Sequence, residues 1–143
     1  MGKRRRGREL ALQLLFQIDM GKLPADEVLA RSFEGASTDQ ETVAFAHGLV
    51  KGALSHIQEI DELLTRYAKD WSLERMASVD RNLLRLALYE LLYMPEIPAS
   101  VSVDEAVELA KRFSTGESGK FVNGILGNVV RDYCPVAARA GHG

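Results

Sequence analysis

The sequence predicts an all-α protein, and three observations support this class. Apolar residues recur at three- and four-residue spacing along most of the chain. No segment alternates apolar and polar residues over the length of a strand. The four prolines stand between the periodic segments, where helices begin or end. With 143 residues, 46% of them apolar, the chain is long enough for one domain with a substantial core.

The first helix is expected from about Arg5 to Met20, where Gly21 ends it. One face of this helix is apolar and should point to the core. Leu12 and Phe16 fall outside that face and project on the side where Arg5 projects. The apolar face contains Leu10, Ala11, Leu14, Leu15 and Ile18.

Two helices are expected in the following segment. Pro24 opens a short one that contains Val28, Leu29, Ser32 and Phe33 and is stopped by Gly35. Thr38 and Glu41 then form a capping box that opens a single helix of nearly eight turns, ending near Tyr67. Gly48 and Gly52 inside that helix predict a close helix crossing, because glycine is unfavourable in a helix interior.

The second half of the chain begins with a short turn of helix at Trp71-Ser72 and another at Ser78. The Asp80 carboxylate would lie near the positive, N-terminal end of the dipole of this second helix. The almost wholly apolar segment from Leu83 to Leu92 predicts the central core helix.

Two prolines, Pro95 and Pro98, then require a loop. A second capping box, Ser102 with Glu105, opens a helix that continues to about Phe113. After a polar loop at 114–118, a last helix extends to Tyr133 and is closed by Pro135.

Positive charge is concentrated at one end of the chain. The formal net charge is −2, yet without five cations near the start 13 basic residues would face 20 acidic ones. These cations lead directly into the first helix, where Phe16 lies about 16 Å beyond Arg5. Guanidinium groups that bind phosphate and a ring that stacks on a base suit single-stranded RNA. A solvated tail or a targeting signal remains open for the run, and a core position remains open for Phe16. The five cations are Lys3, Arg4, Arg5, Arg6 and Arg8.

A second candidate RNA contact lies at the start of the last helix. The residues 116–120 superficially suggest a nucleotide-binding loop. Ser114 replaces its first glycine, Phe121 replaces its hydroxyl residue and no strand precedes it, so nucleotide hydrolysis is rejected. Backbone N–H groups of Ser118 and Gly119 with the Lys120 ammonium could instead hold a phosphate. Phe121 and Asn123 would then offer a stacking face and an amide, with core packing the alternative for Phe121.

The remaining chemistry indicates a binding protein and no enzyme. Cys134 is the only cysteine, so no intramolecular disulfide can form, and we expect a cytoplasmic location. No apolar run approaches the length of a membrane span, and no secretory signal is present. His47 and His56 are nine residues apart, about 13 Å along one helix, and do not form the i, i+4 pair typical of a metal site. We expect neither a metal nor a cofactor.

Several motifs, taken in order, resemble the NusB family of bacterial transcription antitermination factors. The resemblance covers the chain from about Arg4 to Tyr133, and the last three motifs are specific in combination. After the arginine-rich start the motifs are Arg8-Glu9, Gln13-Leu14-Leu15-Phe16, Trp71-Ser72, Val79-Asp80-Arg81 leading to 84–91, Asp104 to Lys111, and Lys120 to Leu126.

This resemblance implies a fold of two small three-helix halves packed together, with about seven helices. One RNA-binding domain would span 1–143, with halves at about 1–70 and 71–134 and a flexible tail at 135–143. It also implies a non-enzymatic adaptor that binds boxA RNA of ribosomal RNA transcripts with NusE, within the RNA polymerase antitermination complex.

By the same similarity, RNA would contact the arginine-rich start, Phe16 and the segment 117–123. Phe16 stands where a tyrosine is common in the family. Since family members differ in self-association, a monomer and a homodimer both stay open. The protein partner would contact the second half, where our candidates are Glu74, Asp80, Arg85 and Tyr89.

The sequence also suggests two rival functions. A similar helical domain precedes the catalytic domain of a ribosomal RNA cytosine methyltransferase, so the chain could be a free-standing RNA-targeting module of that kind. A helical DNA-binding regulator would need a polar recognition helix, and no helix after the first has a clear basic face.

If all five cations contact phosphates, the logarithm of RNA affinity should fall with the logarithm of salt with a slope of about −3.5.

Overall fold

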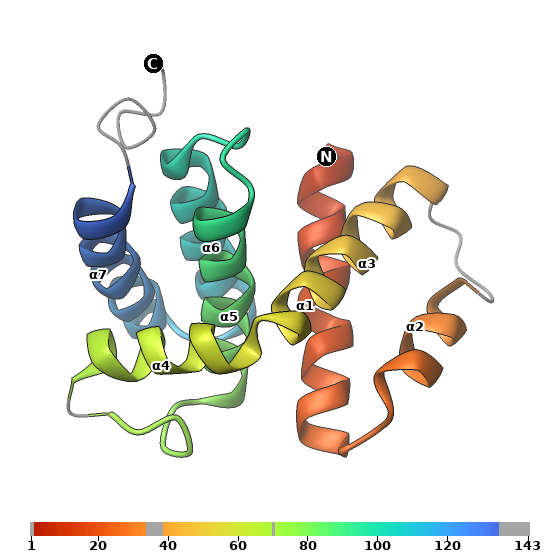
Figure 1. The fold of residues 1–143 in the computed structure, drawn as a ribbon, viewed down its shortest axis with the longest axis horizontal. Helices are drawn as coiled ribbons and strands as arrows, with labels where there is room; N and C mark the ends of the chain where they lie inside the picture. The colour runs from red at the N-terminus through yellow and green to blue at the C-terminus, as the bar shows by residue number, and fades with distance from the viewer. Residues whose placement is uncertain (1, 34–38, 70, 135–143) are drawn as a thin grey trace.

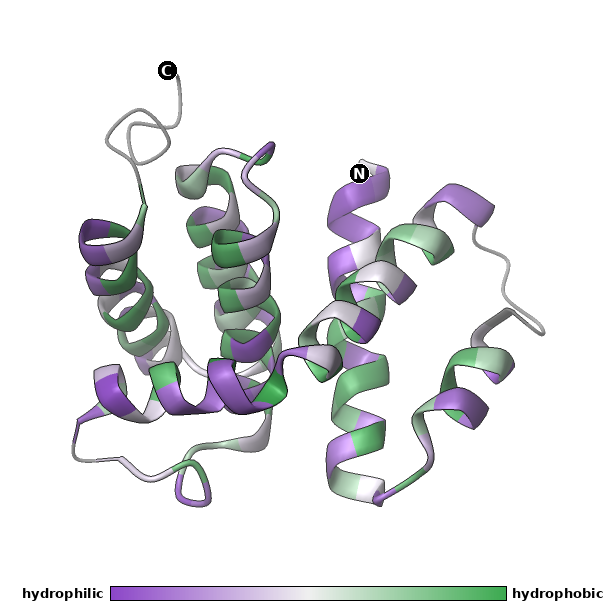
Figure 2. Ribbon diagram, viewed as in Figure 1, coloured by the Kyte–Doolittle hydropathy of each residue, from purple (hydrophilic) through white to green (hydrophobic). Residues whose placement is uncertain are grey.

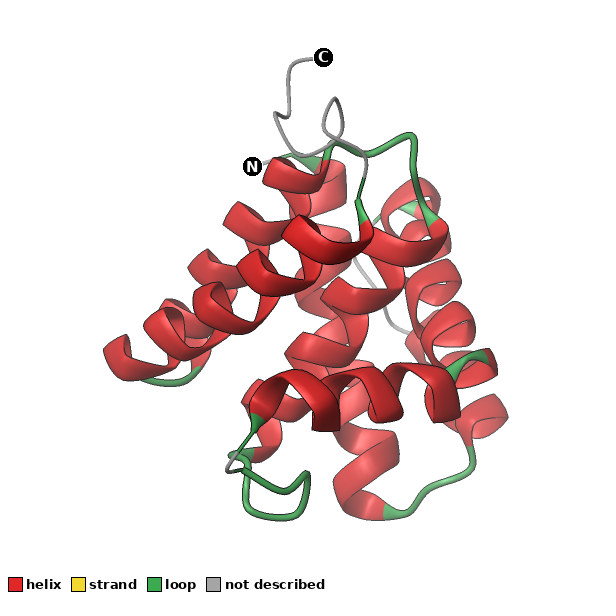
Figure 3. Cartoon of the chain, turned by 60° about the vertical axis from the view of Figure 1, so that its left-hand side comes forward, coloured by secondary structure: helices red, strands yellow, loops and turns green. Residues whose placement is uncertain are grey.

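The computed structural model describes residues 2–33, 39–69 and 71–134 of the chain. These residues form seven α-helices and no strand, which confirms the all-α prediction (Figures 1 and 3). None of these helices is long and apolar enough to cross a membrane. The helices are α1 (Lys3–Gly21), α2 (Ala25–Phe33), α3 (Gln40–Ser55), α4 (Ile57–Ala68), α5 (Ser78–Tyr93), α6 (Ala99–Phe113) and α7 (Gly116–Tyr133).

Helix α5 is the centre of the fold. It packs against α1, α3, α4, α6 and α7, whereas α2 packs only against α1 and α3 among the main helix contacts. Figure 1 shows α1, α2 and α3 on one side of the molecule, with α1 and α3 crossing, and α4 to α7 on the other. The expected division near residue 70 would place α4 with the first group, but α4 packs on α5 and α7. The tail at 135–143 lies outside the described residues.

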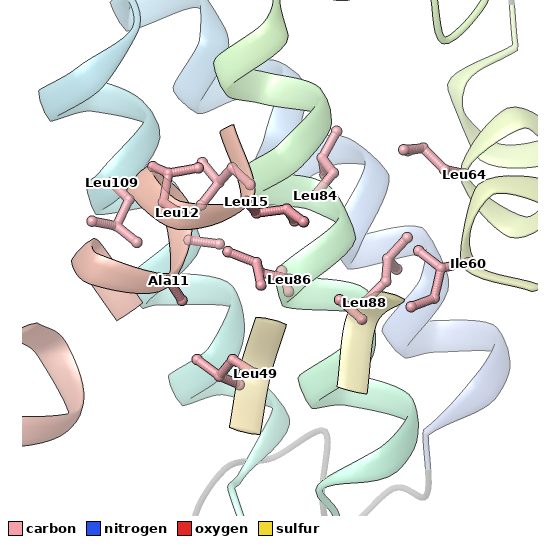
Figure 4. Close-up of a cluster of buried hydrophobic side chains, with 14 of the residues drawn as sticks. Ala11, Leu12, Leu15, Leu49, Ile60, Leu64, Leu84, Leu86, Leu88 and Leu109 are labelled. Carbon is pink, nitrogen blue, oxygen red and sulfur yellow. The ribbon is translucent and has the colours of Figure 1, made fainter. Parts of the chain in front are cut away.

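One buried apolar cluster joins the two groups of helices. Leu84 and Leu88 of α5 lie at its centre, between Leu15 of α1 and Leu49 of α3 on one side and Leu64 of α4 on the other (Figure 4). Figure 2 shows the contrast with the first turns of α1, which are hydrophilic. The apolar run predicted as the core helix therefore occupies the core, because apolar side chains cover most of its circumference.

The long helix predicted up to Tyr67 is wrong as a single element. It is broken at His56, the residue between α3 and α4, whose φ of −115° and ψ of 22° lie outside the helical range. The break lets α3 pack on α1 and α4 turn across α5 and α7 (Figure 1). The capping box is also replaced: Asp39 caps α3 by accepting a hydrogen bond from the Thr42 backbone N–H at 2.9 Å, and Thr38 lies outside the described residues.

Only one of the two glycines marks a close crossing. A Cβ atom on Gly52 would lie 2.0 Å from Cζ of Tyr89 in α5, so this glycine lets α3 and α5 approach. A Cβ atom on Gly48 would meet nothing within 4 Å, so the prediction for Gly48 is wrong.

The predicted turn at Ser72 is present, since its carbonyl accepts from the Arg75 and Met76 backbone N–H groups. The second predicted turn is the start of α5, which begins at Ser78. In α6 the predicted capping box is wrong because the helix starts earlier, at Ala99. Ser102 then lies inside α6, where its hydroxyl donates to Glu90.

Candidate nucleic-acid interface

The five cations at the start of α1 have different surroundings in the folded chain. Their side chains point in several directions around the helix, toward α3, α5 and α6 as well as solvent. The five cations are therefore not equally available to RNA.

We call the cations at the start of α1 the arm. Arg8 does not belong to its exposed part. It is only 6% exposed, and its Nε and Nη2 atoms donate to the two carboxylate oxygens of Glu90 at 2.9 and 2.8 Å. The same carboxylate accepts a hydrogen bond from Ser102 at 2.9 Å. The expectation that Arg8 is available to phosphates is wrong for this conformation, because a buried charge needs its partner.

Arg5 is exposed but also paired. Its Nε and Nη2 atoms donate to Glu105 of α6 at 2.9 and 2.7 Å. Hydrogen bonds from Arg5, together with the charges of Arg5 and Arg8, lower the pKa of Glu105 against the opposing effect of burial. Since this bidentate pair lies at the surface, a phosphate could compete with Glu105 for Arg5.

Lys3 and Arg4 lie beside α3. The Lys3 ammonium donates to Glu41 at 3.0 Å, and this bond with the charge of Asp39 raises the pKa of Lys3. The Arg4 guanidinium lies 5.5 Å from the ring centroid of Phe45, a cation–π distance. Phe45 can approach α1 because Gly7 offers no side chain: a Cβ atom there would lie 2.6 Å from the Phe45 ring.

Arg6 and Phe16 line one groove of about 520 Å³ beside α1. Phe16 is 36% exposed, so of the two positions that the sequence left open for its ring the structure has the exposed one. Leu12 was expected on this exposed side but is 5% exposed. The helix is packed on more than one side, by α3 and by α5, so its buried arc is wider than a single apolar stripe.

The second candidate RNA contact is changed by the way α7 begins. The helix starts at Gly116, earlier than predicted, and Thr115 caps it by accepting from the Ser118 backbone N–H at 3.1 Å. The Gly119 backbone N–H donates to the Thr115 carbonyl. The expected phosphate cradle is therefore wrong, because the Ser118 and Gly119 N–H groups already have acceptors. The Lys120 side chain remains 82% exposed, 3.8 Å from Glu117.

Phe121 and Asn123 differ in exposure. Asn123 is exposed, whereas Phe121 is half-buried and packs against the core. The Phe121 ring meets Trp71 edge-to-face, with centroids 6.4 Å apart, and both line a groove of about 510 Å³ beside α7. The sequence left open whether Phe121 packs in the core or offers a stacking face. The ring does both in part, because it packs against the core and also lines the groove.

The four candidate partner residues do not form one surface. Asp80 is buried and accepts from the Ser118 hydroxyl at 2.9 Å. Arg85 donates to Asp61 at 2.8 and 2.9 Å, and Tyr89 packs over Gly52. These three residues join helices within the fold, and only Glu74 of the four is exposed. A carboxylate at a helix start looks the same in sequence whether it faces solvent or a neighbouring helix.

The histidines and the cysteine have structural surroundings. His47 is buried with its Nε2 atom 2.5 Å from the Ser32 hydroxyl, and burial with the nearby Lys51 charge lowers the pKa of His47. His56 stacks on Tyr93, with centroids 3.9 Å apart. Cys134 is half-buried at the end of α7. Among the described residues, no group of three or more His, Cys, Asp or Glu could hold a metal ion.

Comparison with known proteins decides the family. The model of the NusB family matches residues 5–131. The chain belongs to the NusB family. The match covers all seven helices except the first two residues of α1 and the last two of α7.

Individual relatives of the NusB family agree with this membership. The chain is 50% identical, over 127 residues, to the transcription antitermination protein NusB of Desulforamulus reducens, covering 89% of each protein. A solved structure of T. maritima NusB has 39% identity and a TM-score of 0.86, covering 94% of this chain and 95% of that one. A crystal structure of antitermination factors NusB and NusE in complex with double-stranded RNA has 28% identity and a TM-score of 0.84, covering 93% and 99%.

Several residues around the site escaped sequence reasoning. Phe45, Glu90 and Glu105 each hold an arginine of α1, and Phe113 lines the groove beside Phe16. All four fall on helices whose periodicity indicates only which side faces inward. No local pattern could have connected them to the start of the chain.

Proposed function

We propose that this NusB-family protein is a cytoplasmic, non-enzymatic adaptor for transcription antitermination. It binds the boxA element of ribosomal RNA transcripts as a single strand, together with NusE, and joins the RNA polymerase antitermination complex. The observation that carries this proposal is the groove beside α1, which brings the cation Arg6 and the exposed ring of Phe16 together. Phosphate and base recognition need this combination.

The proposed RNA surface is smaller than the list drawn from the sequence. It contains the exposed cations of the arm, with Arg5 exchanging Glu105 for a phosphate, and Phe16 in the groove. Lys120 and Asn123 extend it along α7, with the half-buried Phe121 between them in the sequence. The relatives support the proposal because they are named antitermination proteins, and a similar fold occurs in the crystal structure of NusB and NusE with double-stranded RNA.

NusE would dock on the second group of helices, α4 to α7. Of the four candidates, Glu74 lies on the surface and is the residue that we propose for this contact. The three components would then assemble on one another. NusE bound beside the RNA surface enlarges that surface, so NusE and RNA each raise the affinity of the protein for the other by the same factor.

Titration of a labelled boxA RNA with the full chain, with and without NusE, tests this function. We expect salt-sensitive binding that NusE strengthens, and weak competition by duplex DNA. Equal binding of boxA RNA and duplex DNA would indicate a general nucleic-acid binder. No response to NusE would favour the free-standing RNA-targeting module.

A further inference from the structure

The loop between α4 and α5, residues 71–77, carries the residue that we propose for the NusE contact. Glu74 is exposed in this loop, and three positions before it Trp71 is 50% exposed. Tryptophan is among the residue types that contribute most to protein interfaces. The contacts that hold this loop in shape therefore matter for partner binding.

The middle of the loop is held by Arg81 of α5. Its Nη1 atom donates to the backbone carbonyl of Leu73 at 2.8 Å, and Leu73 stands between Trp71 and Glu74. The Leu73 side chain itself is only partly buried, whereas Met76 near the end of the loop belongs to the core. The bond from Arg81 therefore fixes the part of the loop that precedes this core anchor, where the two exposed side chains lie.

Arg81 is in turn held from α1. Its Nε and Nη2 atoms donate to one carboxylate oxygen of Asp19, Oδ2, at 3.1 and 2.7 Å. Asn82 donates to the same oxygen at 3.0 Å. Burial opposes ionisation of Asp19, but the hydrogen bonds from Arg81 and Asn82 lower its pKa. The guanidinium is thus fixed along one edge by Asp19 and reaches the Leu73 carbonyl with its remaining nitrogen.

The position of Asp19 is unfavourable for α1 itself. The residue lies in the last turn of α1, where the helix dipole disfavours a carboxylate. The Arg81 side chain is 12% exposed and the Asp19 side chain 20%, so both charges are largely withdrawn from water and depend on each other. The last turn of α1 and the loop lie at the same end of the molecule, and Arg81 bridges them (Figure 1).

We infer that Asp19 is a positioning residue: acting through Arg81, it holds the 71–77 loop in the shape that NusE recognises. The inference rests on the proposed function and extends it from Glu74, which would touch the partner, to a residue of α1 that would not. Without the carboxylate, Arg81 turns toward water and releases the Leu73 carbonyl. NusE must then order the loop as it binds, which lowers its affinity although no contact with it is removed.

Two variants break the link between α1 and the loop at different points. Asp19→Ala removes the acceptor of Arg81. Arg81→Lys keeps a charge beside Asp19 but lacks the planar fork that serves Asp19 and Leu73 together. Asp61→Ala is the matched control, because it removes a carboxylate that accepts two hydrogen bonds from Arg85 of the same helix. Those bonds join α5 to α4 and not to the loop.

Trp71 reports on the loop directly, because it is the only tryptophan of the chain. The decay of its fluorescence anisotropy measures motion of the ring on the nanosecond timescale of loops. NusE affinity and thermal unfolding are measured on the same proteins. We expect Asp19→Ala and Arg81→Lys to make the Trp71 ring more mobile and to weaken NusE binding by about 3- to 30-fold. Asp61→Ala should lower the melting temperature similarly but leave ring motion and NusE affinity near the parent.

The inference is overturned if the Trp71 ring of Asp19→Ala is as ordered as in the parent, or if this variant binds NusE as the parent does. It is also overturned if Asp61→Ala loses as much NusE affinity, since loss of stability alone would then explain the effect. In each of these cases binding of NusE by the parent leaves the proposed function standing. If the parent binds no NusE, the proposed function fails and the inference fails with it.

Discussion

Arg8 of α1 and Glu90 of α5 form a bidentate ion pair in the buried interface between the two groups of helices. Ser102 of α6 donates to the same carboxylate, so one side chain connects three helices. Since the pair fixes the rotation of α1 about its axis, it determines which of the neighbouring cations face solvent. The ion pair therefore positions the candidate RNA surface without belonging to it.

Replacing Glu90 by alanine should lower the free energy of unfolding by about 3–5 kcal/mol, because it removes both hydrogen bonds of the buried Arg8 charge and leaves only Glu105, 3.7 Å away, to balance it. Urea unfolding followed by circular dichroism measures this change. Glu62→Gln on the exposed face of α4 is the control and should leave stability nearly unchanged. A loss below about 1 kcal/mol for Glu90→Ala would show that Arg8 finds water or another acceptor.

Removing the charge of Glu105 should strengthen RNA binding. Arg5 donates twice to Glu105, and RNA must replace that carboxylate before Arg5 can contact a phosphate. We expect Glu105→Gln to tighten binding of boxA RNA by up to about fivefold at low salt, the scale of a surface ion pair. Glu62→Gln makes the same change in net charge away from the arm and controls for long-range attraction. Weaker binding by Glu105→Gln would mean that the pair positions Arg5 for RNA.

The same carboxylate should contribute to loss of stability in acid. Bonds and charges from Arg5 and Arg8 hold the folded-state pKa of Glu105 below its ordinary value of 4.5. The stabilisation is therefore complete above the unfolded pKa and is lost as the pH falls through the lower, folded pKa. The free energy of unfolding, measured between about pH 6 and pH 3, should fall less steeply for Glu105→Gln than for the parent. Parallel curves would remove Glu105 from the acid response.

The two glycines of α3 should respond oppositely to alanine. Gly48→Ala meets no atom within 4 Å and should stabilise the protein by about 0.5–1 kcal/mol, since alanine is the better helix former. Gly52→Ala would drive a methyl group into Tyr89, whose ring is stacked on Tyr93, and should cost about 1–3 kcal/mol. Thermal unfolding of both variants gives the comparison. Equal shifts of the two melting temperatures would mean that Tyr89 moves aside freely.

The salt dependence of RNA binding should be weaker than the sequence suggests. With Arg8 buried, four cations of the arm can reach phosphates, which gives a slope of about −2.8 on logarithmic axes for a single strand. Fluorescence titrations between about 50 and 200 mM salt measure it. Arg4→Ala with Arg6→Ala should then reduce the slope to about −1.4. A parent slope near −3.5 would mean that a fifth cation contacts phosphate, either the exposed Lys120 or Arg8 released from Glu90.

The sequence by itself determined the helical class, most helix positions and the concentration of charge at one end. These features depend on residues within a few turns of one another, such as the apolar run from Leu83 to Leu92 and the cations before Leu10. It also placed Phe16 outside the main apolar face of α1 but left open whether its ring is exposed or buried, and the structure leaves it 36% exposed. The same local reasoning placed Leu12 outside the core, since it could not show that α1 is packed from more than one side.

The tertiary structure alone decided what each cation does. Arg8 and Glu90 are 82 positions apart, and Arg5 and Glu105 are 100 apart, so no periodic pattern could pair them. The break at His56, the burial of Asp80 and the meeting of Phe16 with Phe113 in one groove likewise depend on how helices cross. Sequence periodicity indicates which side of a helix is apolar. Only packing decides which neighbour covers that side, and therefore which charges and rings remain for RNA.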